Sequence, residues 1–407
     1  MLLEIIVPTA IFTAIVVILS ALVLLARRRL EPSGPVSIDV NGEQTVSTEA
    51  GRRLLWALAE NGIYLPAACG GRGTCGQCRV TVRSGGGPSL PTEALHIDAE
   101  ALSKGARLAC AVRIREDMQI SLPTSILDVR QWSCEVISTR SVSTFIKELV
   151  LKLPEPDLMR FDAGAYVIVE APPHEVRFQD LDIGETYQED WHQSGLPELG
   201  SVTTTSTLRA YSLANPPQVD DRLVLLVRIA TPPATAPPGT PPGQASSYLF
   251  SLSPGDRIAV SGPFGEFRAR ESGGEMIFIA GGVGIAPIRS IILDQLARGS
   301  SRKMSLWYGA RARKDLCYIE DFEEAERQHE NFELHVALSA PREDDKRSYH
   351  RGFVHMLVRD HYLSTHSAPG DVEYYLCGPP LMSTAVIAML EQLGVDHSQI
   401  LFDDFGG

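Results

Sequence analysis

The stretch CGGRGTCGQC, residues 69–78, contains three cysteines and four glycines. Thirty-one residues separate Cys78 from Cys110, so the full spacing is C-x5-C-x2-C-x31-C. Structural zinc sites usually take paired C-x-x-C knuckles from two hairpins, and here only one close pair exists. Three thiols on one loop with one distant thiol are instead the arrangement that binds a [2Fe–2S] cluster. The spacing predicts an iron–sulfur centre ligated by Cys69, Cys75, Cys78 and Cys110, with a zinc site or unligated thiols as alternatives.

The glycines of this stretch fit that prediction. A loop that wraps a cluster needs unusual backbone angles and amide groups that approach the sulfurs closely. The five-residue gap between Cys69 and Cys75 resembles the adrenodoxin-like branch of the ferredoxins, because plant-type ferredoxins have four residues there. Cys134 and Cys317 have no partner at a ligand spacing, and we expect them to be buried structural thiols.

The rest of the chain is long enough for several domains. It has 407 residues, of which 44% are hydrophobic and 21% charged, and this composition is typical of a folded protein. The formal net charge of −13 offers no basic footprint for nucleic acid, so we expect no nucleic-acid partner.

The N-terminus predicts a membrane anchor over residues 1–29. Leu2 to Ala26 carries one charge, at Glu4, and is long enough to cross a bilayer, and three arginines follow it. A cleaved signal peptide would have its positive charges first, and a buried core helix is the other alternative. The positive-inside rule places everything after the arginines on the cytoplasmic side of the membrane. Because thiols stay reduced there, a disulfide framework is disfavoured.

Three further blocks follow the anchor. Residues 36–129 predict a small α+β domain, with strands at 36–40, 79–83 and 118–122 and a helix at 49–62. Residues 130–268 predict an antiparallel β-barrel of six strands, interrupted at 172–207 and by the proline-rich loop 232–242. The interruptions are surface excursions or functional loops. Residues 274–407 alternate strands with amphipathic helices in four βα units, and this pattern predicts a parallel sheet with helices on both faces.

Two motifs lie on the predicted barrel. RAYS, residues 209–212, places an arginine, a tyrosine and a serine on one strand. Downstream, Gly243 opens a predicted helix that contains Ser246 and Ser247, and such a helix start is a natural seat for a phosphate. An arginine can compensate a phosphate charge, and a tyrosine can cover an aromatic ring. By itself the RAYS strand is equally consistent with a solvated surface.

Two more motifs follow predicted strands of the parallel sheet. GGVGIAP, residues 281–287, differs from the G-x-G-x-x-G fingerprint because Pro287 stands at the third glycine. Its glycines still allow a pyrophosphate to approach the backbone at a helix start. CGPP, residues 377–380, can reach the same edge of the sheet, although Cys377 is also explained as a small buried side chain.

Taken together, RAYS, the glycine-led serine segment, GGVGIAP and CGPP resemble the ferredoxin–NADP reductase superfamily, with a β-grasp ferredoxin fused in front. The anchor, WYGAR at 307–311 and the terminal DDFGG extend the resemblance, end to end, to the NADH-oxidising subunits of Na+-translocating quinone reductases.

The resemblance implies roles for individual residues. Arg209, Tyr211 and Ser212 would hold FAD, with Gly243, Ser246 and Ser247 near its pyrophosphate. Tyr211 and the C-terminal Phe405 would cover the two faces of the isoalloxazine. The residues implied for NADH are Gly282, Gly284, Pro287, Cys377, Gly378 and Pro379. Ser212, Cys377 and Phe405 would lie at the reacting atoms.

The resemblance also implies a reaction and partners. NADH would deliver a hydride to FAD, and single electrons would pass through the [2Fe–2S] cluster to other membrane subunits and, through them, to ubiquinone. Arg311, Arg313 and Lys314 lie where NADP-dependent relatives hold the 2′-phosphate, whereas the family favours NADH. The alternatives are a membrane-tethered reductase of a bacterial oxygenase and a non-catalytic zinc-binding membrane adaptor.

Overall fold

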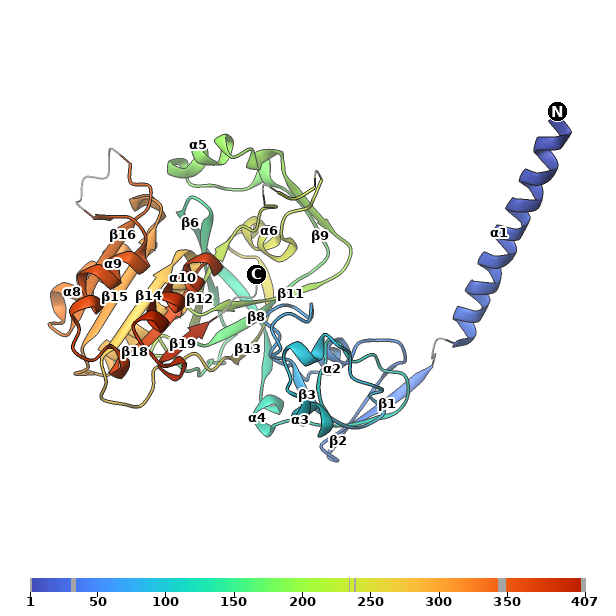
Figure 1. Ribbon diagram of the computed structural model, residues 1–407, viewed down its shortest axis with the longest axis horizontal. Coiled ribbons are helices and arrows are strands. Elements are labelled where there is room, and N and C mark those ends of the chain that lie inside the picture. Colours follow the sequence, from blue (N-terminus) through green and yellow to red (C-terminus); the bar gives the residue numbers. More distant parts are fainter. Residues whose placement is uncertain (1, 31–33, 234, 238, 343–348, 404–407) are drawn as a thin grey trace. The chain divides into compact units, whose positions relative to one another are not determined.

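The computed structural model describes residues 2–30, 34–233, 235–237, 239–342 and 349–403 (Figure 1). The chain forms two compact units. The first comprises residues 1–65 and 71–128, and the second comprises residues 66–70 and 129–407. A single helix, α1 (Leu2–Leu30), precedes the first strand. Within the described residues, the structure contains no helix with the length and apolar character needed to span a membrane.

The first unit is built on a five-stranded mixed sheet of order β2-β1-β5-β3-β4. β1 pairs antiparallel with β2 and parallel with β5, and β3 pairs antiparallel with both β4 and β5. The strands are β1 (Pro35–Val40), β2 (Gln44–Glu49), β3 (Arg79–Ser84), β4 (Ala106–Leu108) and β5 (Met118–Ser121), and the helices are α2 (Leu54–Glu60), α3 (Ala99–Ser103) and α4 (Thr124–Leu127). The predicted strands and the single long loop with the cysteines are confirmed.

The predicted helix over residues 49–62 is too long, because α2 begins only at Leu54. The backbone amides of Gly51 and Leu54 donate to the carbonyls of Ile114 and Val112 at 2.8 and 2.9 Å. Arg53 also forms an isolated β-bridge with Arg113. These donors are therefore used by a strand-like pairing from distant sequence, and the helix cannot extend backwards through them.

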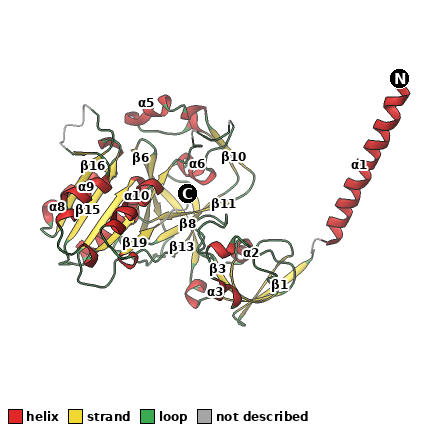
Figure 2. Cartoon of the chain, viewed as in Figure 1, coloured by secondary structure: helices red, strands yellow, loops and turns green. Residues whose placement is uncertain are grey.

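The second unit begins with a six-stranded antiparallel sheet of order β11-β8-β13-β6-β7-β12 (Figure 2). Its edge strands meet, because Leu213 after β11 bridges Leu225 of β12 and the Ala214 amide donates to the Val224 carbonyl at 2.8 Å. This closure confirms the predicted antiparallel arrangement. The strands are β6 (Arg130–Ser143), β7 (Ile146–Lys152), β8 (Tyr166–Ala171), β11 (Thr207–Ser212), β12 (Arg222–Arg228) and β13 (Arg257–Phe264), and the helix α6 (Gln244–Ser251) packs against them.

The interruption at 172–207 is a folded part of this sheet domain. It contains a hairpin of β9 (His174–Arg177) and β10 (Gly200–Thr203) and the helix α5 (Glu185–Gln193). Phe178, Trp191 and Leu196 are buried in the same core as the six-stranded sheet. The alternative of a plain surface excursion is therefore wrong.

The second unit ends in a parallel sheet of order β17-β16-β15-β14-β18-β19. Alternating residues of β14 face opposite cores: Phe278 packs with α7 and α8, while Ile277 and Ile279 pack with α9 and α10. The predicted helices on both faces are confirmed. The elements are β14 (Met276–Gly281), α7 (Ile285–Ala297), β15 (Met304–Ala310), α8 (Ile319–Gln328), β16 (Phe332–Leu338), β17 (His350–Arg351), α9 (Val354–His361), β18 (Glu373–Cys377), α10 (Pro380–Gln392) and β19 (Ile400–Asp403).

A buried ion pair secures the segment that leads into this parallel sheet. Arg302 donates to Glu373 at 2.6 Å and to the carbonyls of Gly274 and Arg270 at 2.6 and 2.9 Å. Ser272 and Tyr375 also donate to Glu373, at 2.7 Å each. Burial alone would raise the pKa of Glu373, but these donors outweigh it and hold the pKa below its usual value.

Replacing Glu373 with leucine is expected to lower the free energy of unfolding by about 3 kcal/mol, because it leaves Arg302 buried without its carboxylate. Urea unfolding followed by tryptophan fluorescence measures this, with the exposed Glu271→Leu as control. In the unsubstituted chain, ionised Glu373 contributes its full share of the free energy of unfolding above pH about 4.3. This contribution is lost as the pH falls through the lower pKa that Glu373 has in the folded state. Equal losses in both variants would contradict the buried pair.

Candidate functional site

The cysteine loop adopts the backbone that its glycines permit. Four glycines of the loop have left-handed φ angles between 66° and 84°: Gly70, Gly71, Gly73 and Gly76. A Cβ at Gly76 would also lie 2.8 Å from the Cβ of His96. A side chain would therefore strain this turn in two ways.

Side chains around the cysteine loop contact backbone carbonyl groups of the loop and of Cys110. Arg53 donates to the carbonyl of Cys110 at 3.1 Å, and Arg79 donates to that of Gly76 at 3.1 Å. A ring nitrogen of His96 lies 3.0 Å from the carbonyl oxygen of Gly73. These contacts fix the backbone on which Cys75, Cys78 and Cys110 are carried.

Two of the predicted ligands, Cys78 and Cys110, are in contact in the first unit. The Cys78 thiol is hydrogen-bonded to Cys110, and this contact, burial and the charges of Cys110 and Cys75 raise its pKa. Cys69 is also buried and lies in the segment 66–70 that groups with the second unit. Crowded thiols of this kind lose their protons when metal supplies positive charge, so the donor chemistry fits an iron–sulfur group.

Over the described part of the chain, no group of three or more His, Cys, Asp or Glu side chains converges tightly enough to hold a single metal ion. A [2Fe–2S] cluster takes two protein ligands on each of two irons, so its ligands form two pairs rather than one tetrahedron.

The strand that leads to Cys110 is anchored by a second buried ion pair. Arg107 on β4 pairs with Glu93 at 2.9 Å, and Glu93 also accepts the backbone amide of Leu108 at 2.9 Å. The remaining Arg107 donors reach the carbonyls of Gly86, Gly87 and Pro88. Nothing in the local sequence pattern distinguishes this pair from surface charges, and the sequence analysis missed it.

The predicted flavin residues lie on β11. Arg209 and Tyr211 share one face of the strand, and Ser212 lies on the other, because successive side chains alternate. The Arg209 guanidinium donates to the Leu208 carbonyl at 2.8 Å. Burial raises the pKa of Tyr211, partly offset by Arg209, so this phenol stays protonated. An aromatic ring and a cation on one strand face fit the ring and the phosphate of a flavin nucleotide.

The predicted phosphate seat is the start of α6, where Gly243 is the N-cap. Both serine hydroxyls are already used: Ser246 and Ser247 donate to the Gly243 carbonyl at 3.0 and 2.8 Å. What this helix start offers a phosphate is therefore its first-turn backbone amides and its positive dipole end, rather than these hydroxyls.

The two glycine motifs of the parallel sheet meet at one edge. β14 pairs with β15 on one side and β18 on the other, so the strand order reverses at β14, where such sheets bind their ligands. A Cβ at Gly284 would lie 2.2 Å from the carbonyl oxygen of Cys377 and 2.6 Å from the amide nitrogen of Gly378. A Cβ at Gly281 would lie 3.2 Å from the Cδ atom of Pro379. Gly282 lies between Gly281 and Gly284, and Pro287 is in the first turn of α7.

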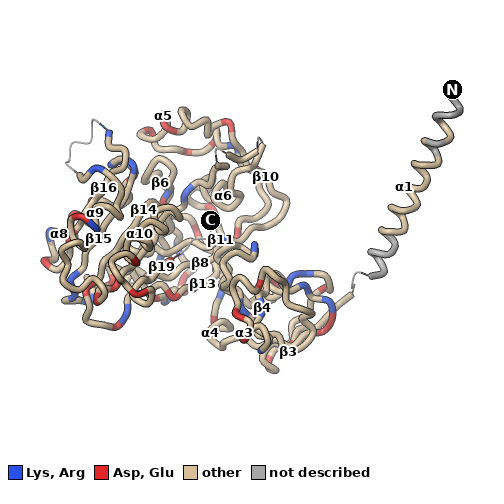
Figure 3. The backbone as a smooth tube through the Cα atoms, viewed as in Figure 1, with Lys and Arg blue, Asp and Glu red and all other residues tan. Residues whose placement is uncertain are grey.

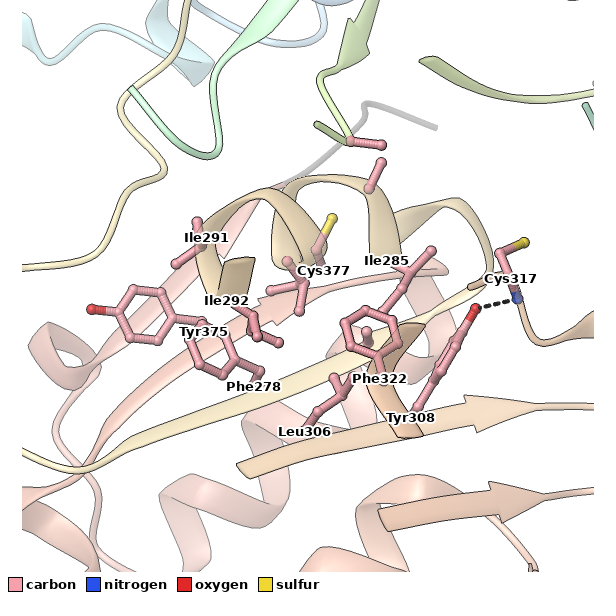
Figure 4. Close-up of a cluster of buried hydrophobic side chains, with 14 of the residues drawn as sticks. Phe278, Ile285, Ile291, Ile292, Leu306, Tyr308, Cys317, Phe322, Tyr375 and Cys377 are labelled. Carbon is pink, nitrogen blue, oxygen red and sulfur yellow. Dashed lines mark hydrogen bonds between the residues drawn. The ribbon is translucent and has the colours of Figure 1, made fainter. Parts of the chain in front are cut away.

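Cys377 itself belongs to the core. Its side chain is fully buried at the end of β18, among the residues that pack against α7 (Figure 4). Cys317 is buried in the same cluster, where its amide donates to the Tyr308 hydroxyl at 2.9 Å. Burial raises the pKa of Cys317 to about 12, so it is an inert thiol, as predicted.

The C-terminal strand β19 contacts both β11 and β18. The Ser212 hydroxyl donates to Asp403 at 3.4 Å, and Asp403 is the register partner of Cys377. The sequence analysis did not single out Asp403, although DDFGG follows the predicted sheet directly. Phe405 lies outside the described residues. Ser212 and Cys377, predicted to act at the same atoms, are thus both neighbours of Asp403: its side chain accepts from Ser212, and its backbone lies in register with Cys377.

Replacing Gly284 with alanine is expected to weaken NADH binding at least about tenfold, because the two loops at this edge must separate to admit a methyl group. Isothermal titration of the full chain with NADH measures it. Gly273→Ala is the matched control, since a Cβ there meets no atom within 4 Å. An unchanged affinity in the Gly284 variant would show that this edge does not bind the dinucleotide.

Three protein families match successive parts of the chain. Residues 38–115 match the 2Fe-2S iron-sulfur cluster binding domain, 198–269 the oxidoreductase FAD-binding domain and 278–387 the oxidoreductase NAD-binding domain. Among solved structures, an Amycolatopsis cytochrome P450 reductase, GcoB, is 26% identical with a TM-score of 0.63, covering 91% of this chain and 98% of its own. The ferredoxin reductase in carbazole 1,9a-dioxygenase shares the fold, with 22% identity, a TM-score of 0.60 and the same coverage.

Two curated relatives are similar from end to end. The F subunit of the Na(+)-translocating NADH-quinone reductase of Neisseria meningitidis serogroup C is 48% identical over 405 residues, covering 99% of this chain and all of its own. The corresponding F subunit of Klebsiella pneumoniae is 50% identical over 407 residues, with the same coverage. The chain therefore belongs to the family of the F subunits of Na(+)-translocating NADH-quinone reductases.

Proposed function

We propose that this chain is the electron-input subunit of a Na+-translocating NADH:quinone reductase. The observation that carries the proposal is the 48–50% identity to such subunits over 99% of the chain, together with matched iron–sulfur, FAD and NAD domains. When bound, FAD accepts a hydride from NADH, and the [2Fe–2S] cluster takes up single electrons. The protein positions these groups and passes the electrons to a partner subunit.

The residues of the second unit would orient the hydride donor and acceptor. Tyr211 would cover one face of the flavin ring and Phe405 the other, with Arg209 and the start of α6 at Gly243, Ser246 and Ser247 near the phosphates. The edge formed by Gly282, Gly284, Pro287, Cys377, Gly378 and Pro379 would hold NADH. The hydrogen bond from Ser212 to Asp403 supports this arrangement, because it joins the flavin strand to the strand beside Cys377.

The cluster ligands in this proposal are Cys69, Cys75, Cys78 and Cys110. Their spacing lies wholly inside the matched iron–sulfur domain. The positive φ angles of the loop glycines and the contact between Cys78 and Cys110 support it as well. The structural domains would span residues 36–129, 130–268 and 274–407.

We also propose that residues 1–29 anchor the chain in the bacterial inner membrane, with its domains on the cytoplasmic side. The support is the apolar sequence from Leu2 to Ala26 followed by three arginines, and the exposed side chains of α1 from Ile11 to Val23. The acceptor would be another membrane subunit of the complex, and ubiquinone would be reduced through it.

Cys75→Ala is expected to abolish the electron paramagnetic resonance signal of the cluster while NADH still bleaches the flavin absorption, since the two sites use different residues. Cys134→Ala is the matched control, because Cys134 is a buried thiol outside the ligand set. Loss of flavin reduction in a folded Cys75 variant would contradict the separate sites. A preparation that contains zinc and no flavin would instead favour the non-catalytic adaptor.

Deleting residues 2–30 is expected to move the chain, expressed without other subunits, from the membrane pellet to the supernatant. Ultracentrifugation after a high-salt wash measures this, and retained flavin absorption shows that the remaining domains are folded. A full-length chain that stays in the supernatant would overturn the anchor.

A further inference from the structure

The helix α5 presents one carboxylate to two cations of the parallel-sheet domain. Each oxygen of Asp190 has its own partner: Oδ1 accepts from Arg342 at 2.8 Å, and Oδ2 pairs with Lys314. The side chains of Asp190 and Lys314 are only 16% and 18% exposed, so water screens this pair less than a surface pair. Acidic residues recur along α5 and its flanks (Figure 3).

Asp190 is held in this position by its neighbour in sequence. Trp191 is buried, and its indole N–H donates to the Thr144 carbonyl at 2.6 Å. Its ring also packs against Phe178 and Phe250, with centroids 6.1 and 6.0 Å away. The Thr144 hydroxyl in turn donates to Asp315 at 3.0 Å, next to Lys314. The Asp190 carboxylate is therefore held in place by the core of the antiparallel sheet domain, in which Trp191 is buried.

Of the two cations that Asp190 engages, Arg342 follows β16 and Lys314 follows β15. This strand pairs with β14 along its full length, so the segment after it lies at the same sheet edge as Gly282 and Gly284. In doubly wound sheets the end of this neighbouring strand meets the ribose 2′-oxygen of a dinucleotide, and basic residues there accept a 2′-phosphate. Arg313, between Arg311 and Lys314, lies 3.7 Å from Glu320.

We infer that Asp190 is a specificity-determining residue that disfavours NADPH at the dinucleotide site. By engaging Lys314 and Arg342 it withdraws the charge that a 2′-phosphate would need, and its own negative charge repels that phosphate. The basic segment at 311–314 consequently does not mark a site for NADPH. This inference rests on the proposed function, because it assumes that the sheet edge binds NADH.

The test compares two probes that differ only in the 2′-phosphate, adenosine 2′,5′-bisphosphate and 5′-AMP, by isothermal titration of the full chain. Asp190→Asn is expected to raise the affinity for the bisphosphate relative to AMP by about tenfold, since one repulsion is removed and two cations are released. Glu189→Gln is the matched control, because it makes the same charge change at the adjacent, exposed position. Adding Lys314→Met to Asp190→Asn should remove most of the gain.

The outcomes separate this inference from the proposed function. Asp190 has no role in specificity if AMP binds and Asp190→Asn leaves the ratio of the bisphosphate and AMP affinities unchanged. The same conclusion follows if Glu189→Gln changes this ratio equally. If neither AMP nor NADH binds, the proposed dinucleotide site is wrong. Lys314→Met alone gives a test that leaves Asp190 in place: we expect it to lower the bisphosphate affinity less than about threefold, and a loss of about tenfold or more would overturn the inference.

Discussion

The close approach of Gly284 to the backbone of Cys377 and Gly378 is the constraint on which the catalytic half of the molecule depends. No side chain fits between the two loops, since a Cβ there would lie 2.2 Å from a carbonyl oxygen. The loops can meet only because β14 and β18 are adjacent and parallel, and their carboxyl ends fall at the point where the strand order reverses. The start of α7 and the end of β18 thereby form one surface for a dinucleotide.

The sheet edge that carries Gly284 also contacts the antiparallel sheet domain through polar side chains. Asp403, in register with Cys377, accepts the hydroxyl of Ser212. On the other side of β14, Asp190 reaches Lys314 after β15. Both contacts pair a residue of the antiparallel sheet domain with one that follows or flanks a parallel strand. These polar contacts add to an apolar core in which Ile146, Ala214 and Leu226 of the antiparallel sheet domain pack with residues of the parallel sheet, so polar and apolar contacts together set the relative positions of the two sites.

Much of this architecture could be predicted from the sequence, where local pattern and tertiary structure agree. The strand and helix periods of residues 276–392 predicted the parallel sheet, because apolar strands there alternate with helices that bury one face against it. The helix over 49–62 was predicted too long, because the amides of Gly51 and Leu54 bond to residues some sixty positions away. The polar segment with β9, α5 and β10 gave no periodic signal, since it is anchored mainly by single residues such as Trp191.

The site was predicted best where its chemistry needs particular residues at particular spacings. Cysteine spacing and glycine-rich turns are of this kind, and the structure places Gly284 beside Cys377 as the motifs suggested. It could not be predicted from sequence that the hydroxyls of Ser246 and Ser247 bond to Gly243, or that Asp190 faces Lys314. These contacts depend on side-chain direction and on distant parts of the chain, which no local pattern encodes.

An anaerobic titration of the purified protein with NADH measures whether one chain carries electrons from NADH through FAD to a [2Fe–2S] cluster. FAD takes up two electrons and the cluster one, so complete reduction should need about 1.5 NADH per chain, with the flavin absorption and the cluster resonance both reaching their end points. An end point at about 1 NADH per chain without a cluster resonance, or no uptake by a protein that contains zinc, would contradict the account.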